Sequence, residues 1–71
     1  MRVLISGAAG YIGCWTTRKF IEAGHDIVAV DKLLFPSGVA ALSSLGVTPI
    51  EADIRTHDFT RHHDVDVVVH L

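Results

Sequence analysis

The stretch Ser6-Gly7-Ala8-Ala9-Gly10-Tyr11-Ile12-Gly13 decides the fold of this chain. An apolar run, Val3-Leu4-Ile5, leads into it, and a segment with helical character, residues 11–23, leads out of it. Continuous apolar character is typical of a parallel strand that is covered on both faces. The stretch is therefore expected to be the turn that joins a buried strand to a helix.

Three glycines at a spacing of three residues suit this turn to binding an anion. Gly7 lets the chain turn sharply with a positive φ. Gly10 has no Cβ, so the backbone can approach a ligand, and Gly13 lets the helix pack tightly on the strand. The N-terminus of the helix offers free N–H groups and the positive end of its dipole to an anion. A dinucleotide pyrophosphate is the usual anion at such a place.

The spacing G-x-x-G-x-x-G differs from the dinucleotide fingerprint G-x-G-x-x-G, so a ligand-free turn is the alternative. A second apolar run ends in Asp31, close to the position, about 20 residues further on, where an acid that binds the adenosine ribose is expected. Its carboxylate can accept hydrogen bonds from the ribose hydroxyls and repels a 2′-phosphate. This favours NAD over NADP, although the cation of Lys32 partly offsets the repulsion. A solvated aspartate at a strand end is the other interpretation of Asp31.

Strands and helices alternate along the chain. Strands are predicted at residues 2–6, 26–31, 47–51 and 64–71, helices at 11–23 and 38–45, a loop at 33–37, and one or two helical turns within 56–62. Such alternation indicates parallel β-α-β units with right-handed crossovers. The predicted fold is α/β: the N-terminal part of a Rossmann-type doubly wound parallel sheet with strand order 3-2-1-4.

Local signals sharpen these bounds. The spacing of Ile12, Thr16 and Phe20 predicts the buried face of the first helix. Ser37 is a candidate N-cap for the second helix. Pro49 lacks an N–H group, so the third strand should lie at the edge of the sheet.

Composition excludes several classes of protein. The chain has 71 residues, 49% of them hydrophobic, which is unlike a disordered tail. A formal net charge of -2 gives no electrostatic reason to expect nucleic acid or a membrane surface as a partner. Cys14 is the single cysteine, so no intrachain disulfide can form and a cytoplasmic location is expected. The first strand begins at once, so no signal peptide is expected.

Three motifs carry a resemblance to a known family: the glycine stretch at 6–13, Val-Asp-Lys-Leu at 30–33 and Ala-Asp-Ile-Arg at 52–55. Together they resemble the extended short-chain dehydrogenase/reductase family, in particular its NAD-dependent nucleotide-sugar epimerases and dehydratases. The resemblance runs from Arg2 to Leu71. It implies that residues 1–71 are the N-terminal part of an NAD(P)-binding domain, with the catalytic and substrate-binding regions outside this sequence.

The resemblance also implies roles for individual residues. Asp53 would contact the adenine amino group and the backbone at Ile54 the adenine ring, whereas the alternative for Asp53 is a cap on the turn at Arg55. His70 is interpreted as a hydrogen-bonded core histidine, and Leu71 would touch the cofactor through its carbonyl group. The full set of predicted cofactor-binding residues is Gly7, Gly10, Tyr11, Ile12, Gly13, Asp31, Lys32, Asp53, Ile54 and Leu71.

The function implied by the resemblance is hydride transfer at C4 of a nucleotide-sugar, with NAD as cofactor and a homodimer as the assembly. The family's catalytic Tyr-x-x-x-Lys is missing from residues 1–71, since Trp15 stands four residues after Tyr11, so no catalytic residue is predicted. Two alternatives stay open: a non-catalytic dinucleotide-binding regulator and an NADP-linked carbonyl reductase of the same family.

Two further groups of residues are candidates for chemical activity. The dipole of the first helix could lower the pKa of the Cys14 thiol, but a small packing residue is the alternative. His57, His62 and His63 lie close to Asp58 and Asp64 in the sequence. Their spacing matches no zinc pattern, so no metal site is predicted.

Overall fold

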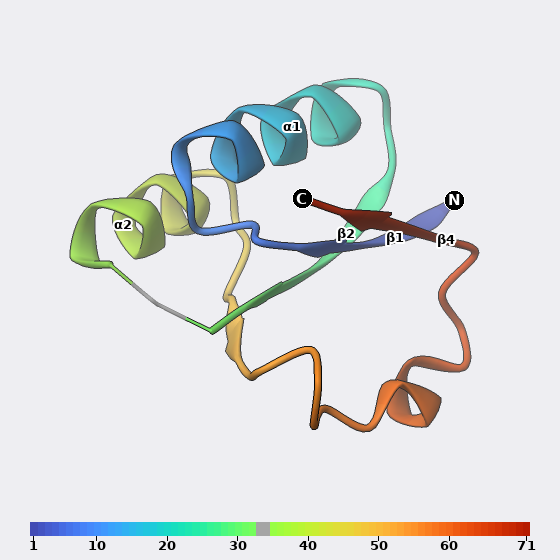
Figure 1. Cartoon of the computed structure of the whole chain (residues 1–71). Coiled ribbons are helices and arrows are strands. Elements are labelled where there is room, and N and C mark those ends of the chain that lie inside the picture. Colours follow the sequence, from blue (N-terminus) through green and yellow to red (C-terminus); the bar gives the residue numbers. More distant parts are fainter. Residues whose placement is uncertain (33–34) are drawn as a thin grey trace.

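A computed structural model describes residues 1–32 and 35–71 as a four-stranded parallel sheet with helices packed against it (Figure 1). The elements, in chain order, are β1 (Arg2–Ser6), α1 (Tyr11–Glu22), β2 (Asp26–Asp31), α2 (Pro36–Ser44), β3 (Ile50–Glu51), the 3₁₀ helix η1 (Phe59–His62) and β4 (Val67–His70). The strand order is β3-β2-β1-β4, which confirms the predicted order. Leu33 and Leu34, part of the predicted loop and of the Val-Asp-Lys-Leu motif, lie outside the described residues.

The two central strands are buried on both faces of the sheet, as their continuous apolar sequences predict. On the face covered by α1 and α2, Val3, Ile5 and Ala29 pack with Leu42 of α2. The opposite face has its own cluster of Leu4, Val28 and Val30, against which Ala52 and Val65 pack. Those last two residues flank the segment between β3 and β4, which passes on the side of the sheet away from the helices (Figure 1). The chain thus has a small core on each side of β1 and β2.

The buried face of α1 agrees with the predicted one only in part: Phe20 packs against the core as predicted, whereas Ile12 does not. Gly13 and Thr17 are the buried residues of this helix, whereas Ile12 is 59% exposed. A Cβ at Gly13 would overlap the carbonyl oxygen of Gly7, so the helix approaches the loop more closely than any larger side chain would permit. This close approach turns the Gly13–Thr17 side of α1 inward and leaves Ile12 at the surface.

Helix α2 begins at Pro36, two residues before its predicted start. Phe35 is its N-cap, with extended backbone angles (φ −65°, ψ 138°), and Pro36 occupies a position in the first turn. Proline is favoured there because its fixed φ suits the helix and its missing N–H would have had no partner. Ser37 therefore lies inside the helix and is not its N-cap.

The third and fourth strands are shorter than predicted. β3 consists of Ile50 and Glu51 and, among the residues that the structure describes, pairs with β2 alone, so its predicted edge position is confirmed while its predicted length is wrong. Pro49 cannot donate to a ladder, and β3 begins just after it. In β4, Val67 and Val68 are exposed in this chain. None of the helices in residues 1–32 and 35–71 combines the length and apolar character needed to cross a membrane.

Candidate functional site

The glycine-rich loop leaves the carboxyl end of β1 and turns back over the end of β2. Gly7 has a φ of +75°, as its place in the motif predicts. The Gly7 N–H donates a 2.9 Å hydrogen bond to the carbonyl oxygen of Val30 in β2, and the Gly10 N–H donates to the Gly7 carbonyl at 3.3 Å. These bonds fix the loop at the carboxyl edge of the sheet, which is where ligands bind in open α/β folds.

The backbone of the loop has free space beside it at Gly10. Its backbone angles (φ −77°, ψ 173°) suit any residue. The nearest atom to a Cβ built there would be the Gly7 carbonyl oxygen at 3.6 Å, an ordinary contact. The fold itself therefore does not demand glycine at this position, and an approaching ligand gives a reason for it.

The N-terminus of α1 follows directly and has no side chain capping it. Gly10 is the N-cap, and no acidic residue stands in the first turn. The N–H groups of the first helical turn have no partner within a helix, so this end suits an anion. The side chains of Tyr11 and Ile12 are largely exposed, which leaves the backbone as the part of these residues that faces the loop.

Asp31 connects the end of β2 to the glycine loop. Its Oδ2 accepts a 2.9 Å hydrogen bond from the Ala9 N–H. The residue is partly buried, so it is not the solvated strand-end aspartate of the alternative interpretation. The carboxylate that the sequence assigns to ribose is thus held within reach of the loop assigned to pyrophosphate.

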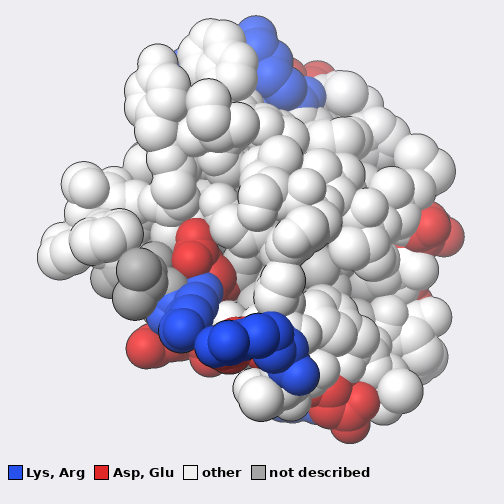
Figure 2. Space-filling view, in the orientation of Figure 1, with Lys and Arg blue, Asp and Glu red and all other residues white. Residues whose placement is uncertain are grey.

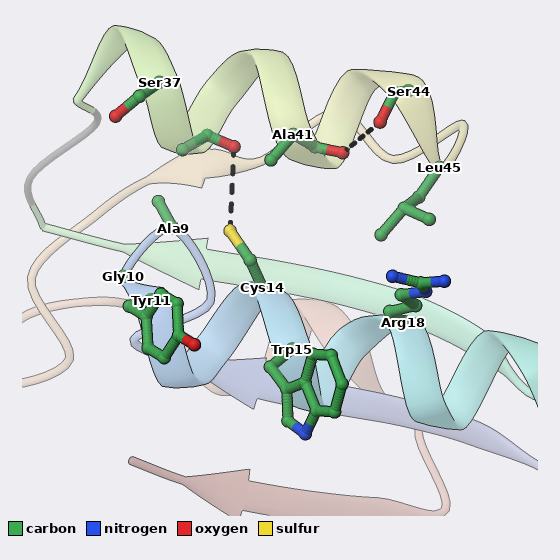
Figure 3. Close-up of a pocket in the computed structure, with 11 residues that line it drawn as sticks. Ala9, Gly10, Tyr11, Cys14, Trp15, Arg18, Ser37, Ala41, Ser44 and Leu45 are labelled. Carbon is green, nitrogen blue, oxygen red and sulfur yellow. Dashed lines mark hydrogen bonds between the residues drawn. The ribbon is translucent and has the colours of Figure 1, made fainter.

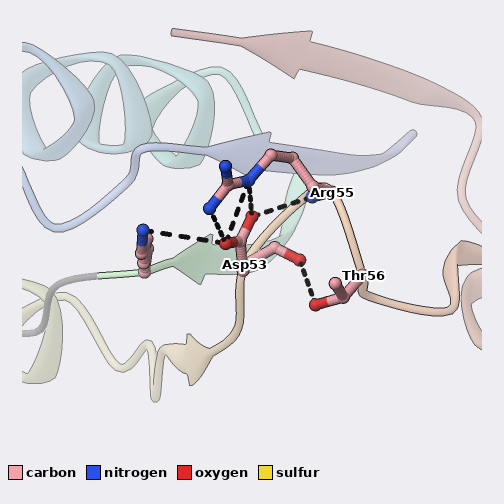
Figure 4. A network of polar contacts seen from close by, with 4 residues as sticks. Asp53, Arg55 and Thr56 are labelled. Atoms are coloured by element: carbon pink, nitrogen blue, oxygen red, sulfur yellow. Dashed lines mark hydrogen bonds and ion pairs between the residues drawn. The ribbon is translucent and has the colours of Figure 1, made fainter.

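The structure places Asp53 in a network of ion pairs after β3 (Figure 4). Its carboxylate accepts hydrogen bonds from the Arg55 backbone N–H (2.9 Å), from Nε (3.1 Å to each oxygen) and from Nη2 (2.6 Å). Lys32 Nζ lies 3.7 Å from Oδ2. The hydrogen bonds from Arg55 hold the pKa of Asp53 well below its ordinary value. The alternative role of Asp53, a cap on the turn at Arg55, is therefore present, while its contact with adenine remains a prediction, as does that of Ile54.

The carboxyl end of β4 also reaches the glycine loop. The Leu71 N–H donates to the Ser6 carbonyl at 3.3 Å, and the Leu71 carbonyl oxygen would lie 3.2 Å from a Cβ at Gly7. This puts the backbone of Leu71 beside the loop, while its contact with the cofactor remains a prediction. His70 Nδ1 lies 2.6 Å from the Ser6 hydroxyl, so this histidine is hydrogen-bonded, although it is exposed in this chain and is not a core residue.

A groove of about 620 Å³ runs between α1 and α2, with the Gly10 end of the loop at its margin (Figure 3). Tyr11, Trp15 and Arg18 line it from α1. Cys14 also lines it, with its Sγ 3.8 Å from the Gly38 carbonyl oxygen. Burial, with a smaller contribution from the charge of Asp31, raises the pKa of this thiol. Both effects disfavour a helix-activated thiolate, and Cys14 packs against the core, as the alternative of a small packing residue expects.

Two of the three histidines near η1, His57 and His62, contact each other. The Nε2 atoms of His57 and His62 lie 2.8 Å apart and their rings are stacked. Within residues 1–32 and 35–71, no group of three or more His, Cys, Asp or Glu side chains is arranged to hold a metal ion.

Sequence reasoning missed two residues that shape the site. A Cβ at Gly38 would overlap the carbonyl oxygen of Ala9, so this glycine lets α2 press against the glycine loop. The signal for Gly38 in the sequence was a glycine within a predicted helix. Such a glycine lowers the stability of the helix by about 1 kcal/mol relative to alanine, so its presence indicates a packing constraint. The other is Arg55, whose guanidinium group donates to both carboxylate oxygens of Asp53. The sequence shows this ion pair only as an acidic and a basic residue two positions apart.

Comparison with known proteins gives concordant matches along the whole chain. Residues 3–71 match the NAD dependent epimerase/dehydratase family. A UDP-glucose 4-epimerase of Klebsiella pneumoniae is 31% identical over 81 residues, which cover 100% of this chain and 58% of the relative. A UDP-glucose 4-epimerase of Halalkalibacterium halodurans is 36% identical over 76 residues, covering 100% of this chain and 22% of the relative.

A solved structure is similar as well. The UDP-glucose-4-epimerase of Stenotrophomonas maltophila, crystallised with bound NAD and formylated UDP-arabinopyranose, superposes with a TM-score of 0.79 at 34% identity. The match covers 100% of this chain and 24% of that one. The chain thus spans between about a quarter and somewhat over half of the length of these relatives.

Proposed function

This chain belongs to the NAD dependent epimerase/dehydratase family, and we propose that it forms the NAD-binding part of a nucleotide-sugar epimerase or dehydratase. The observation that carries the proposal is the hydrogen bond between Ala9 and Asp31. It brings an open glycine loop, an uncapped helix N-terminus and a carboxylate to one edge of the sheet. These three features together are typical of a dinucleotide-binding site.

The residues present fit the two polar parts of NAD. The backbone at Gly10, Tyr11 and Ile12 would bind the pyrophosphate, because the first-turn N–H groups of a helix can donate hydrogen bonds to an anion. Asp31 would accept hydrogen bonds from the ribose hydroxyls and disfavour a 2′-phosphate. The Leu71 backbone, beside Gly7, would contact the cofactor on the β4 side.

The oxidised nicotinamide supplies a hydride acceptor, and by similarity to the relatives the donor would be C4 of a sugar in a nucleotide-sugar. This chain's contribution is to bind and orient the cofactor. Residues 1–71 contain no Tyr-x-x-x-Lys, so we propose that proton transfer and substrate binding fall to residues outside this sequence. We also propose a homodimer, and a cytoplasmic location that fits the single cysteine.

The direct test measures cofactor binding and turnover in the complete protein. Isothermal titration should show binding of NAD⁺ that is tighter than that of NADP⁺. Incubation with UDP-glucose, UDP-galactose or dTDP-glucose, followed by chromatography of the nucleotide-sugars, should show epimerisation or loss of water. Absence of dinucleotide binding would overturn the proposal, whereas binding without turnover of any nucleotide-sugar would favour the non-catalytic regulator.

A further inference from the structure

The carboxylate of Asp53 is fully engaged by cations and by N–H groups of its own loop. Oδ1 accepts from Arg55 N and Nε, and Oδ2 accepts from Arg55 Nε and Nη2 with Lys32 Nζ at 3.7 Å. A carboxylate has about four lone-pair sites, so these contacts use its accepting capacity. An adenine amino group could bond to Asp53 only by displacing one of them.

The network joins the residue that follows Asp31 to the loop after β3. Lys32 stands next to Asp31, and Asp53 holds its ammonium group across the carboxyl ends of β2 and β3. The Lys32 side chain is 63% exposed and the Asp53 side chain 22%. An exposed lysine at this distance is held weakly, and it can turn to another anion if Asp53 loses its charge.

The acidic side chains of this corner outnumber its basic side chains by one. Asp31 and Asp53 offset Lys32 and Arg55, and Glu51, which is in register with Asp31 on the neighbouring strand, adds one more negative charge. The face shown in Figure 2 accordingly carries basic and acidic side chains in contact at its lower left, rather than a field of one sign. A 2′-phosphate, with a charge of about −1.5 to −2 at neutral pH, finds no uncompensated cation in such a network.

We propose that Asp53 is a cofactor-specificity residue, which excludes NADP by holding Lys32 and Arg55 away from the position of a 2′-phosphate. The inference rests on the proposed function, since it assumes that the adenosine ribose lies at Asp31. It differs from an adenine contact in a measurable way. Adenine is common to NAD and NADP, so losing an adenine contact weakens both cofactors equally, whereas freeing Lys32 favours NADP alone.

The test measures the dissociation constants of NAD⁺ and NADP⁺ for variants of the complete protein, at one low ionic strength. Asp53→Asn keeps the shape of the side chain and removes the negative charge that attracts both cations, so the preference for NAD should fall about three- to tenfold. Adding Lys32→Gln to Asp53→Asn should remove most of that change. Asp58→Asn is the matched control, because it removes a carboxylate from the same segment, one that accepts from the Thr60 N–H, while the ion pair of Lys32 with Asp53 stays in place.

Arg55→Gln provides an independent test, because it should change the preference for NAD in the opposite direction. It leaves the charge of Asp53 without its main partner, so the preference for NAD should rise. This variant keeps the inference testable if Asp53→Asn does not fold. An unchanged NAD/NADP ratio in both variants, or the same shift in Asp58→Asn, would overturn the role of Asp53. If the unmodified protein binds neither dinucleotide, the proposed function itself has failed.

Discussion

The Ala9 N–H donates a 2.9 Å hydrogen bond to Asp31 Oδ2, and this bond joins the glycine loop to the end of β2. Asp31 therefore has a structural contact in addition to its proposed contact with ribose. The two roles can be separated, because an asparagine can keep an oxygen acceptor for Ala9 while it loses the negative charge.

Replacing Asp31 should change cofactor choice. In Asp31→Ala, loss of charge-assisted hydrogen bonds to ribose should cost roughly 1.5–3 kcal/mol of NAD binding, while loss of the repulsion should narrow or reverse the advantage over NADP. Asp31→Asn should show the same change in preference with less loss of thermal stability. Titration calorimetry and thermal unfolding give the two readouts. Equal losses of affinity for both cofactors would mean that Asp31 is structural only.

The glycines at positions 10 and 13 should respond differently to substitution. Gly10→Val should leave the fold intact, since its backbone angles and surroundings accept a side chain, but should abolish dinucleotide binding by filling the space of the pyrophosphate. Gly13→Ala should destabilise the protein by about 1–3 kcal/mol, because its Cβ would overlap the Gly7 carbonyl. Circular dichroism with NAD titration would test both. Unchanged NAD affinity in folded Gly10→Val would refute the loop assignment.

Thr17 should be a site at which stability can be gained. It is completely buried, and no group among the described residues forms a hydrogen bond with its Oγ1. Thr17→Val keeps the branched shape and removes the unsatisfied hydroxyl, so it should stabilise the protein by about 1 kcal/mol. Ser44→Ala is a suitable control, since the Ser44 hydroxyl donates to the Ala41 carbonyl and is exposed. Chemical denaturation of the complete protein measures the difference, and a less stable Thr17→Val would show that the hydroxyl does have a partner.

Acid should weaken the segment between β3 and β4. Hydrogen bonds from Arg55 lower the pKa of Asp53 from its ordinary value of 3.8, and those from Thr60 lower the pKa of Asp58. A carboxyl group whose pKa is lower in the folded state than in the unfolded state stabilises the fold at pH values above its unfolded-state pKa. This stabilisation is lost as the pH falls through its folded-state pKa. The destabilisation caused by Asp53→Asn should therefore be larger at about pH 6 than at about pH 2.5. Denaturant melts at both pH values are the measurement, and an equal effect would contradict the assignment.

The exposed strand β4 should make residues 1–71, as an isolated chain, poorly stable or prone to associate. Val68 is 59% exposed on a strand that pairs only with β1 among the described residues. An apolar edge favours association, and a sheet this small is marginally stable. The isolated chain should be partly unfolded or should associate, and Val68→Lys should reduce the association. Sedimentation with thermal unfolding tests this, and a monomer with a sharp cooperative melt would contradict it.

The elements whose signal is local could be predicted from the sequence. The apolar runs predicted β1 and β2 with their bounds, and Gly7 predicted the positive φ. Alternation of strands and helices indicated parallel β-α-β units, and the known order of the doubly wound fold then predicted the strand order. The errors arose where tertiary contacts decide. Ile12 has the right period for a buried face, but the close contact at Gly13 rotates the helix away from it.

The candidate site was predictable to a similar extent. The glycine loop and Asp31 follow from their spacing, and the structure brings them together. The fork of Arg55 on Asp53 depends on side-chain geometry, and the contact of Gly38 with Ala9 joins residues far apart in the sequence. Neither has a periodic signature.

The contacts of Gly13 and Gly38 with the loop have a thermodynamic consequence. From two different helices, these residues confine the carbonyl groups of Gly7 and Ala9, so the loop is preorganised before any ligand arrives. Little conformational entropy then remains to be lost at this end of the site when a dinucleotide binds. The heat-capacity change of binding should accordingly reflect the surface that the ligand itself buries, without a contribution from ordering of the glycine loop.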